Sequence, residues 1–435
     1  MNSYLIFIFI LLSHIINSSY IKLPFKNTRN ISSLSNFEPL DIIYEYLLET
    51  DIIVDLKVGI NPQIIPMSLS LQYKYIYITS NNLYFGIYDK DKSYTFKTNE
   101  ESPLPDFSYF KKGIFCNESF IFNSEKAEIK VHNIPFILIT EMANENEYRK
   151  GLIGLQIASY KQEDTFIYQL KNKKLINNYY HYLKFTKEDE GYFIIGNQPH
   201  EYDSSKYTSA NLRQVNTKEI SQIWELNIFN IKYGEAEFGS KNYFLDFSFG
   251  MISVGVNIKN EFYNDFFKER IVNGLCDENR YKDYFFYSCI NDDKKVKYKE
   301  LKELHFLHHE LEYDFVFNYN DLFINYNNRN YFLITYKINS MTTIFGKPFF
   351  KKYTIVFNPD NKQIGHYIKE EQILSEKKEE KNNLKIILFI IIILVLIIIM
   401  LFLGYFLNKI IRRKKRKNEI DEEFDYFSEN SNILK

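Results

Sequence analysis

The chain has 435 residues, and its 54 Lys and Arg residues nearly balance its 55 Asp and Glu residues, leaving a formal net charge of −1. This balance argues against nucleic acid as a partner, because proteins that bind nucleic acid usually present a clear excess of basic residues. Only three cysteines occur, so disulfides cannot be the main source of stability.

The first element is a short apolar segment at residues 4–16, followed by Asn17, Ser18 and Ser19. An apolar stretch of this kind behind the initiator is typical of a secretory signal peptide, and it is too short to cross a bilayer comfortably. We therefore predict a signal peptide over residues 1–19 and a chain that enters the secretory pathway.

The globular region that follows, residues 20–368, is too long for one typical domain and suits two lobes. We expect an N-terminal lobe at residues 20–217 and a C-terminal lobe at residues 218–368. Short runs of alternating apolar and polar residues, such as residues 311–320, favour half-buried strands. The predicted fold is mostly β, with short helices at residues 218–223 and 260–271.

A long apolar run near the C-terminal end begins at Ile386 and ends at Leu407. A helix of this length covers the roughly 30 Å of a hydrocarbon core at about 1.5 Å per residue. Residues 369–385, rich in Lys and Glu, then form a charged stalk between the lobes and the membrane. The sequence predicts one transmembrane helix over residues 386–407.

Basic residues crowd directly behind this run and fix its orientation; they are Lys409, Arg412, Arg413, Lys414, Lys415, Arg416 and Lys417. By the positive-inside rule the tail, residues 408–435, stays cytoplasmic, and the ectodomain is lumenal or extracellular. Binding of the same basic block to anionic lipid headgroups is a compatible alternative. We predict a single-pass type I membrane protein.

Two covalent features are expected in such an ectodomain. Cys276 and Cys289 can close one short loop in an oxidising lumen, which leaves Cys116 unpaired. Sequons at Asn30 and Asn117 fit a glycoprotein.

Six motifs in order along the ectodomain carry a family resemblance. They are VGINPQ at residues 58–63, IYI at 76–78, GLIGL at 151–155, GYFIIG at 191–196, YFLDFSFG at 243–250, and IFGKPF at 344–349 running on to YTIVFN at 353–358. In this order and spacing the chain resembles the pepsin-like aspartic peptidases. The resemblance implies a bilobal double β-barrel and a peptide-binding cleft between the lobes.

The resemblance also implies where the reacting groups belong. In this family two carboxylates, one from each lobe and each in Asp-Thr-Gly, share a proton and hold a water, so that one acts as base and the other as acid. At the family's spacing the first triplet falls on Ser70, Leu71 and Gln72, and the second on Asp246, Phe247 and Ser248.

The first aspartate is therefore replaced by Ser70, and Asp246 is the retained position. A hydroxyl cannot serve as a base at ordinary pH, and a lone carboxylate cannot easily make both proton transfers, each worth about 10² to 10⁴-fold. Ser70 as a nucleophile would need an adjacent base, and no histidine motif accompanies it. Asp246 can equally be a structural carboxylate held by backbone donors.

Further expectations concern the surroundings of the site. Ile153-Gly154 and Phe345-Gly346 form an internal repeat in which each glycine allows backbones to approach beneath a site loop. Tyr109 is the candidate for the family's flap tyrosine; the alternative is a chance match among the 36 tyrosines of the chain.

Two groups of residues have side chains that could bind a metal or act in catalysis, but we expect them to be ordinary surface residues. The segment HFLHHE at residues 305–310 holds metal-ligating residue types without the spacing of a helical zinc site, so we expect solvent-facing histidines, no metal and no cofactor. Asp51 and Asp55 are expected to be surface charges.

Three functions remain open. The first is a membrane-anchored homologue that binds an extended peptide without cleaving it. The second is an active aspartic-type endopeptidase with a variant site. The third is a structural surface ectodomain whose cleft is filled. The missing carboxylate at Ser70 favours the first over the second.

Overall fold

The computed structural model describes residues 20–29, 34, 38–80, 87–103, 110–123, 128–142, 150–157, 164–217, 222–338 and 342–368, together with residues 405, 407, 409, 411 and 412. The chain divides into two compact units, Met1–Ile368 and Lys369–Lys435, and the fold below is that of the first unit. The predicted signal peptide and stalk lie outside the described residues, as does the predicted anchor except for Tyr405 and Leu407. Among the helices of the described part, none is long and apolar enough to span a membrane.

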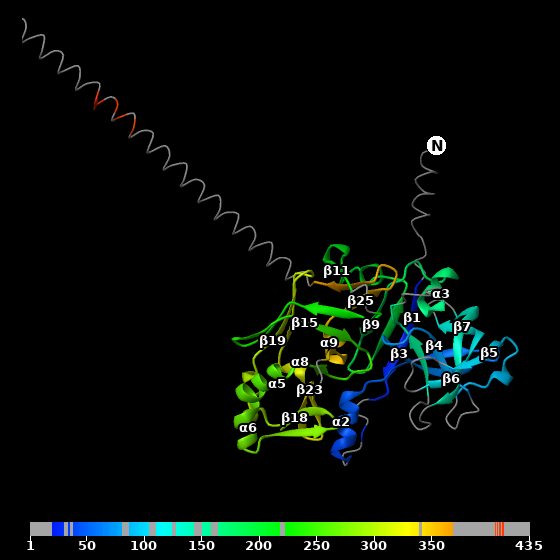
Figure 1. The fold of residues 1–435 in the computed structure, drawn as a ribbon, viewed down its shortest axis with the longest axis horizontal. Helices are drawn as coiled ribbons and strands as arrows, with labels where there is room; N and C mark the ends of the chain where they lie inside the picture. The colour runs from blue at the N-terminus through cyan, green and yellow to red at the C-terminus, as the bar shows by residue number, and fades with distance from the viewer. Residues whose placement is uncertain are drawn as a thin grey trace, which may run out of the picture. The chain divides into compact units, whose positions relative to one another are not determined.

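Among the described residues of this unit strands dominate, as the alternating sequence patterns predicted (Figure 1), and they form three sheets of thirteen, nine and four strands. In order across the thirteen-stranded sheet they are β11 (Leu212–Asn216), β26 (Gln363–Tyr367), β25 (Ile355–Asn358), β9 (His181–Phe185), β10 (Glu190–Ile195), β1 (Ile21–Asn27), β2 (Ile52–Val58), β3 (Gln63–Ser70), β8 (Gly151–Gly154), β4 (Ile76–Thr79), β7 (Glu128–Met142), β6 (Phe110–Asn123) and β5 (Lys97–Pro103).

The other two sheets are built from residues 225–345. The nine-stranded sheet contains β12 (Glu225–Ile228), β15 (Lys241–Leu245), β24 (Thr343–Phe345), β16 (Ile252–Ser253), β23 (Ile334–Lys337), β18 (Tyr284–Ile290), β22 (Arg329–Phe332) and β21 (Phe323–Tyr326), with β17 (Cys276–Tyr281) paired to β18. The four-stranded sheet contains β14 (Ala236–Phe238), β13 (Asn230–Tyr233), β19 (Leu304–His308) and β20 (Tyr313–Phe317). In β20 buried and half-buried residues alternate, as predicted for residues 311–320.

Helices are short and lie between the strands. The helix predicted at residues 260–271 is confirmed, because α5 (Val256–Phe262), the π-helical η5 (Tyr263–Phe267) and α6 (Lys268–Val272) follow one another without a break. Most of the other predicted helix, at residues 218–223, lies outside the described residues. The remaining helices are α2 (Leu40–Leu48), η2 (Lys90–Lys92), α3 (Phe166–Asn172), α4 (Pro199–Tyr202), η4 (Ser209–Asn211), α7 (Asp293–Val296), η6 (Tyr298–Glu300), α8 (Tyr319–Leu322) and α9 (Lys347–Lys352).

One strand arrangement occurs twice. Strands β3, β8, β4 and β7 are neighbours in that order, and so are β15, β24, β16 and β23. In both sets the first pair is parallel, the second antiparallel and the third parallel. The internal repeat predicted from the sequence is therefore a repeat of topology.

The glycines of this repeat lie where the backbones come closest. A Cβ atom on Gly154 would lie 2.5 Å from the carbonyl oxygen of Tyr73, and one on Gly346 would collide with the carbonyl oxygen of Phe249. Real Cβ contacts do not come so close, so both positions require glycine. This confirms the predicted reason for the Ile153-Gly154 and Phe345-Gly346 pairs.

The segment before β2 is part of the folded core. Strand β1 lies between β10 and β2. Helix α2 buries Ile43, Tyr44, Leu47 and Leu48 against Phe249, Met251, Phe286, Tyr326 and Tyr331. The first residues of the chain that the structure describes therefore contact strands from residues 225–345 as well as their own sheet.

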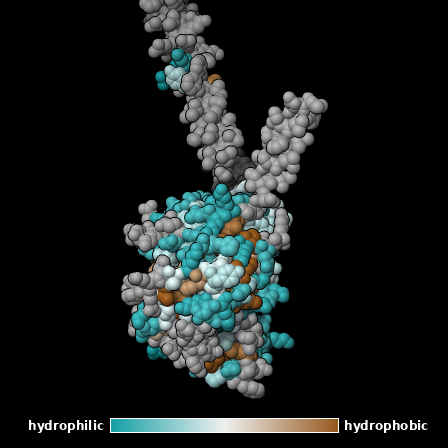
Figure 2. All heavy atoms as spheres, turned by 90° about the vertical axis from the view of Figure 1, so that its right-hand side faces the viewer, coloured by the Kyte–Doolittle hydropathy of each residue, from teal (hydrophilic) through white to brown (hydrophobic). Residues whose placement is uncertain are grey.

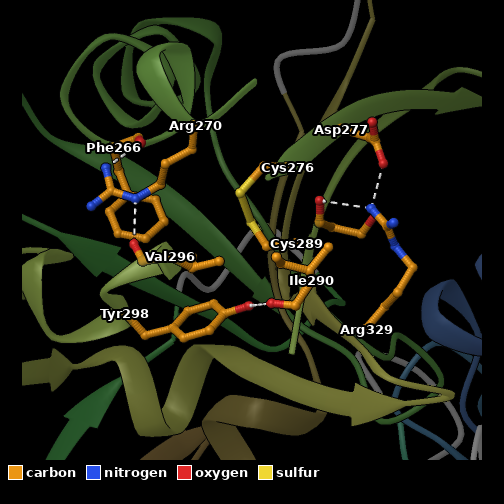
Figure 3. Close-up of a disulfide and its surroundings, with 10 residues drawn as sticks. Phe266, Arg270, Cys276, Asp277, Cys289, Ile290, Val296, Tyr298 and Arg329 are labelled. Carbon is orange, nitrogen blue, oxygen red and sulfur yellow. Dashed lines mark hydrogen bonds and ion pairs between the residues drawn. A yellow bond between two sulfur atoms is a disulfide. The ribbon is translucent and has the colours of Figure 1, made fainter. Parts of the chain in front are cut away.

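The predicted disulfide is confirmed. Cys276 and Cys289 face each other across the β17–β18 hairpin and are bonded (Figure 3). Beside them Arg270 donates to the carbonyl of Val296 over 2.6 Å, and the Tyr298 hydroxyl donates to the carbonyl of Ile290 over 2.7 Å. Cys116 is free, as expected, and it is buried.

The described surface carries few large apolar residues. Figure 2 shows a mainly hydrophilic face interrupted by small hydrophobic patches. Strongly exposed apolar side chains such as Ile64, Tyr94 and Val272 are scattered along the sequence. Isolated residues of this kind are ordinary on protein surfaces and do not define an interface.

Candidate functional site

Ser70 and Asp246 occupy equivalent positions in the repeated arrangement. Ser70 is the last residue of β3 and pairs with Gly154, whereas Asp246 follows β15, whose last residue Leu245 pairs with Phe345. The next step of that register places Asp246 beside Gly346. Both side chains are buried, at 5% and 6% exposure.

Asp246 accepts hydrogen bonds from neutral groups. One carboxylate oxygen, Oδ1, accepts from the backbone N–H and the hydroxyl of Ser248 at 2.8 and 2.7 Å, and Oδ2 accepts from the side-chain amide of Gln72 at 2.7 Å. Burial raises the pKa of the Asp246 carboxyl, and the bonds from Ser248 and Gln72 oppose this rise. Among the described residues no second carboxylate bonds to Asp246.

Gln72 joins the two site positions. Its backbone N–H donates to the Ser70 hydroxyl oxygen at 3.2 Å, while its side chain reaches across to Asp246. Gln72, at the position where the resemblance implied a glycine, therefore lies next to the carboxylate. An amide neither gives nor takes a proton at ordinary pH, so this pair cannot act as an acid and a base.

The two site loops are held together without the threonines that the resemblance implied. Leu71 and Phe247, which occupy those positions, are buried apolar residues. The bond from Gln72 to Asp246 links the two loops, and Thr50, which precedes β2, bonds to the second loop: its hydroxyl donates to the carbonyl of Phe247 and its N–H donates to the carbonyl of Ser248 at 2.8 Å. Sequence reasoning missed Thr50, because no local pattern points to a partner almost 200 positions away.

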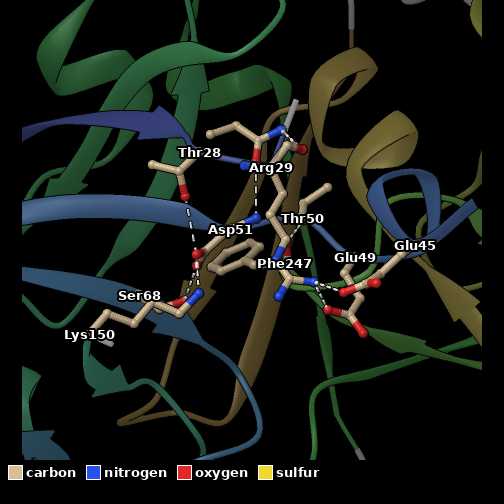
Figure 4. A network of polar contacts seen from close by, with 10 residues as sticks. Thr28, Arg29, Glu45, Glu49, Thr50, Asp51, Ser68, Lys150 and Phe247 are labelled. Carbon is tan, nitrogen blue, oxygen red and sulfur yellow. Dashed lines mark hydrogen bonds and ion pairs between the residues drawn. The ribbon is translucent and has the colours of Figure 1, made fainter. Parts of the chain in front are cut away.

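The expectation that Asp51 is a surface charge is wrong. Asp51 is only 5% exposed and accepts from the hydroxyls of Ser68 at 2.8 Å and Thr28 at 3.1 Å, and it forms an ion pair with Lys150 (Figure 4). Asp51 directly precedes β2 and contacts Ser68 of the neighbouring strand β3, two residues before Ser70. Asp55 is exposed, as expected.

A hollow of about 390 Å³ lies beside Asp246. This volume falls in the range of small-molecule sites, which are mostly apolar with a few polar groups. Its lining residues are Gln72, Gln156, Ile223, Phe244, Leu245, Asp246, Thr342 and Ile344. Residues from both halves of the repeat thus enclose one space.

On the other side of Gln72, aromatic residues pack together. Tyr73 and Tyr75 lie against a buried cluster that includes Tyr77 and Phe110, and the rings of Tyr77 and Phe110 stack at 5.3 Å. The candidate flap residue Tyr109 directly precedes Phe110 but lies outside the described residues.

The histidine-rich segment does not form a cluster of metal ligands. His305 contacts Asp314 at 2.7 Å, whereas His308 is 3% exposed and accepts from the N–H of Leu311 at 3.2 Å. The expectation that these histidines face solvent is therefore wrong for His308, because the turn after β19 folds over its ring. Within the described part of the chain no group of three or more potential metal-ligating residues comes together.

The sequon at Asn117 lies in a paired strand. Asn117 is opposite Lys97 on one side and Pro135 on the other, and the Ser119 hydroxyl is buried against His132. An exposed loop, the usual context of such a triplet, is not what the fold provides here. The other predicted site, Asn30, lies outside the described residues.

Together, the mostly β fold and the repeated strand arrangement with its two glycines are those of a pepsin-like aspartic protease domain. The family profile described as Eukaryotic aspartyl protease matches residues 72–367, more than half of the chain. The chain therefore belongs to this family, as its motifs predicted. No curated protein matches the chain in a sequence comparison.

Proposed function

We propose that this protein is a membrane-anchored, pepsin-like aspartic peptidase homologue that binds an extended peptide between two lobes without hydrolysing it. One observation carries the proposal: the amide of Gln72 is bonded to Asp246 at 2.7 Å, in a site whose other position is Ser70. A hydroxyl and an amide stand where the reaction needs a second carboxylate and a water.

The chemistry of the reaction explains why this loss is severe. Hydrolysis of a peptide bond by this family needs one group to take a proton from water and another to give one to the substrate. The described partners of Asp246, Gln72 and Ser248, are neutral. Asp246 alone could do only one of the two tasks at a time.

Peptide binding is supported by the space that remains. The hollow beside Asp246 has apolar walls that include Ile223 and Ile344, and Gln156 lines it with a carboxamide that can donate and accept. An extended peptide is recognised by main-chain hydrogen bonds combined with pockets for alternate side chains. A polar and apolar lining of this kind suits that mode.

The membrane location rests on the sequence. The apolar segment at residues 4–16, the apolar run that ends at Leu407 and the basic block behind it support a type I protein with a lumenal or extracellular ectodomain. The confirmed disulfide between Cys276 and Cys289 supports an oxidising compartment, because structural disulfides are rare in the cytosol.

The test is an acid-pH assay of the full-length chain on generic peptide substrates, with pepstatin as inhibitor. We expect no pepstatin-sensitive cleavage. Cleavage that pepstatin blocks and that Asp246→Asn abolishes would establish the alternative, an active endopeptidase with a variant site. Because Asp246→Asn keeps the size of the side chain and replaces the ionisable carboxyl by an amide, it separates the site's own activity from that of a contaminating protease.

A structural ectodomain is the second candidate, and one observation favours it. Gln72 spans the gap to Asp246, and the neighbouring Tyr73 packs onto Phe110 with ring centroids 6.2 Å apart, so part of the space between the site loops is filled. Binding of peptides at neutral pH without turnover supports the first proposal. A chain that is folded but binds none of a diverse peptide library supports the structural role.

A further inference from the structure

The hollow beside Asp246 contains one charged group among the described residues that line it. Ile223, Phe244, Leu245 and Ile344 form the apolar part, while the other polar lining residues are neutral amides and a hydroxyl. The single charge of Asp246 therefore dominates the electrostatic potential inside this space.

The charge of Asp246 is not balanced by a cation from the described part of the chain. Its hydrogen bonds come from Ser248 and Gln72, which are both neutral. Buried charges in proteins are ordinarily paired. Asp51 shows the usual solution in the same molecule: it is buried to a similar degree, 5% against 6%, and is paired with Lys150.

Asp246 also has capacity left to bind a donor. A carboxylate offers about four acceptor positions, and the structure fills two on Oδ1 and one on Oδ2. A donor from a ligand can therefore still bond to Oδ2 of Asp246.

We propose that the ligand of this hollow carries a protonated amine next to an apolar side chain. The ammonium group would donate to Oδ2 of Asp246, and the apolar part would cover Ile223 and Ile344. Either a lysine side chain or a free peptide N-terminus supplies this chemistry. The inference rests on the proposed function and names the class of peptide that the site selects.

Three peptides of one apolar sequence test the inference on the full-length chain. The first is capped at both ends and contains one lysine, the second has norleucine in its place, and the third is the norleucine peptide with a free N-terminus. Norleucine keeps the alkyl chain and removes the charge. We expect the first or the third peptide to bind at least about tenfold more tightly than the second, a difference typical of close charge pairs, and the tighter one identifies the source of the amine.

Two variants test whether the preference for the amine comes from the charge of Asp246. In Asp246→Asn the preference for the amine should fall below about twofold, since the shape of the site is kept and the charge is lost. In Asp55→Asn, which removes an exposed carboxylate on β2, the preference should remain.

Each outcome decides one question. Equal binding of all three peptides, or a preference that survives in Asp246→Asn, overturns this inference and leaves the proposed function standing. Absence of binding by every peptide overturns the proposed function and this inference with it. The comparison among peptides uses the unchanged chain, so it remains decisive even if Asp246→Asn fails to fold.

Discussion

The side-chain amide of Gln72 donates a hydrogen bond to Oδ2 of Asp246 over 2.7 Å, between residues 174 positions apart in the sequence. The resemblance to the family implied a glycine at position 72, which has no side chain to fill this space. Here the amide of Gln72 bonds to the carboxylate, and the same residue's backbone N–H contacts Ser70. One residue with a neutral side chain therefore links the two loops.

Replacing Gln72 by leucine should destabilise the protein by about 1 to 3 kcal/mol, because it leaves a buried carboxylate oxygen without its donor. Gln156→Leu is the matched control: Gln156 lines the same hollow but does not bond to Asp246, so its effect should stay within about 0.5 kcal/mol. Urea unfolding at neutral pH measures both. Equal costs for the two variants would show that the bond to Asp246 contributes nothing.

Asp246→Asn should raise the melting temperature at neutral pH, and the gain should shrink as the pH falls. Burial raises the folded-state pKa of this carboxyl above its ordinary value. The folded chain therefore binds the proton more tightly than the unfolded chain does, and stability is lost as the pH rises through the folded-state pKa. The asparagine variant does not titrate and escapes this loss.

Thermal unfolding of both proteins between pH 3 and pH 7 checks this prediction. The amide oxygen of the variant can still accept from Ser248, so its folded structure should be kept. A variant that is less stable than the parent chain by the same amount at every pH would contradict the prediction. It would mean that hydrogen bonds to the carboxylate outweigh the cost of burying its charge.

The sequence predicted the framework of this molecule better than its site contacts. Motif order and the Gly154 and Gly346 positions were predictable because backbone geometry forces particular residues at particular spacings. The Gln72 bond to Asp246 and the Thr50 bond to Phe247 were not, because each depends on how two distant loops approach each other. Membership of a family that uses threonines at these loops gave no hint of the substitute contacts.

The burial of the charged residue Asp51 could not be predicted from the sequence either. Asp51 and Asp55 look alike in sequence, yet only the first lies under a neighbouring strand. Burial of a polar residue depends on tertiary packing, and a short charged segment carries no periodic signal of it. The partners Lys150 and Thr28 are far away along the chain and could not be paired with Asp51 in advance.

Asp51→Asn should cost at least about 2 kcal/mol of stability, since breaking a buried ion pair leaves Lys150 without its counter-charge. Asp55→Asn, on the exposed face of β2, should change stability by no more than about 0.5 kcal/mol. Denaturant unfolding of the two variants side by side measures the difference. A small effect for Asp51→Asn would mean that its hydrogen bonds, for example from Ser68, carry the contribution without the charge.

Replacing Cys276 and Cys289 together by serine should lower the free energy of unfolding by about 3 kcal/mol, the value expected for a closed loop of this length.

The free thiol of Cys116 should react slowly with thiol reagents in the folded protein at pH 8 and quickly after unfolding. The reason is that burial raises the pKa of this thiol to about 11. Mass spectrometry of labelled protein counts the reacted thiols. Fast labelling of Cys116 in the folded state would place it nearer the surface than the structure does.

Ser70→Asp alone should not restore hydrolysis. The new carboxylate would meet a site in which Gln72 already occupies Oδ2 of Asp246, and neither Leu71 nor Phe247 offers a hydroxyl to lock the loops. A second buried acid near the first also disfavours ionisation of both. The single variant should therefore be inactive, and its stability should fall at neutral pH and recover in acid.

The matched comparison replaces the whole site. A variant with Asp-Thr-Gly in both loops also changes Leu71, Gln72, Phe247 and Ser248, so it reopens the space that the Gln72 amide fills. If the missing groups alone account for the proposed lack of hydrolysis, this variant hydrolyses peptides at acid pH and loses that activity when Asp246 becomes asparagine. Substantial activity in Ser70→Asp alone would instead show that the neighbouring residues matter less than the carboxylate, and that the amide of Gln72 yields its place to water.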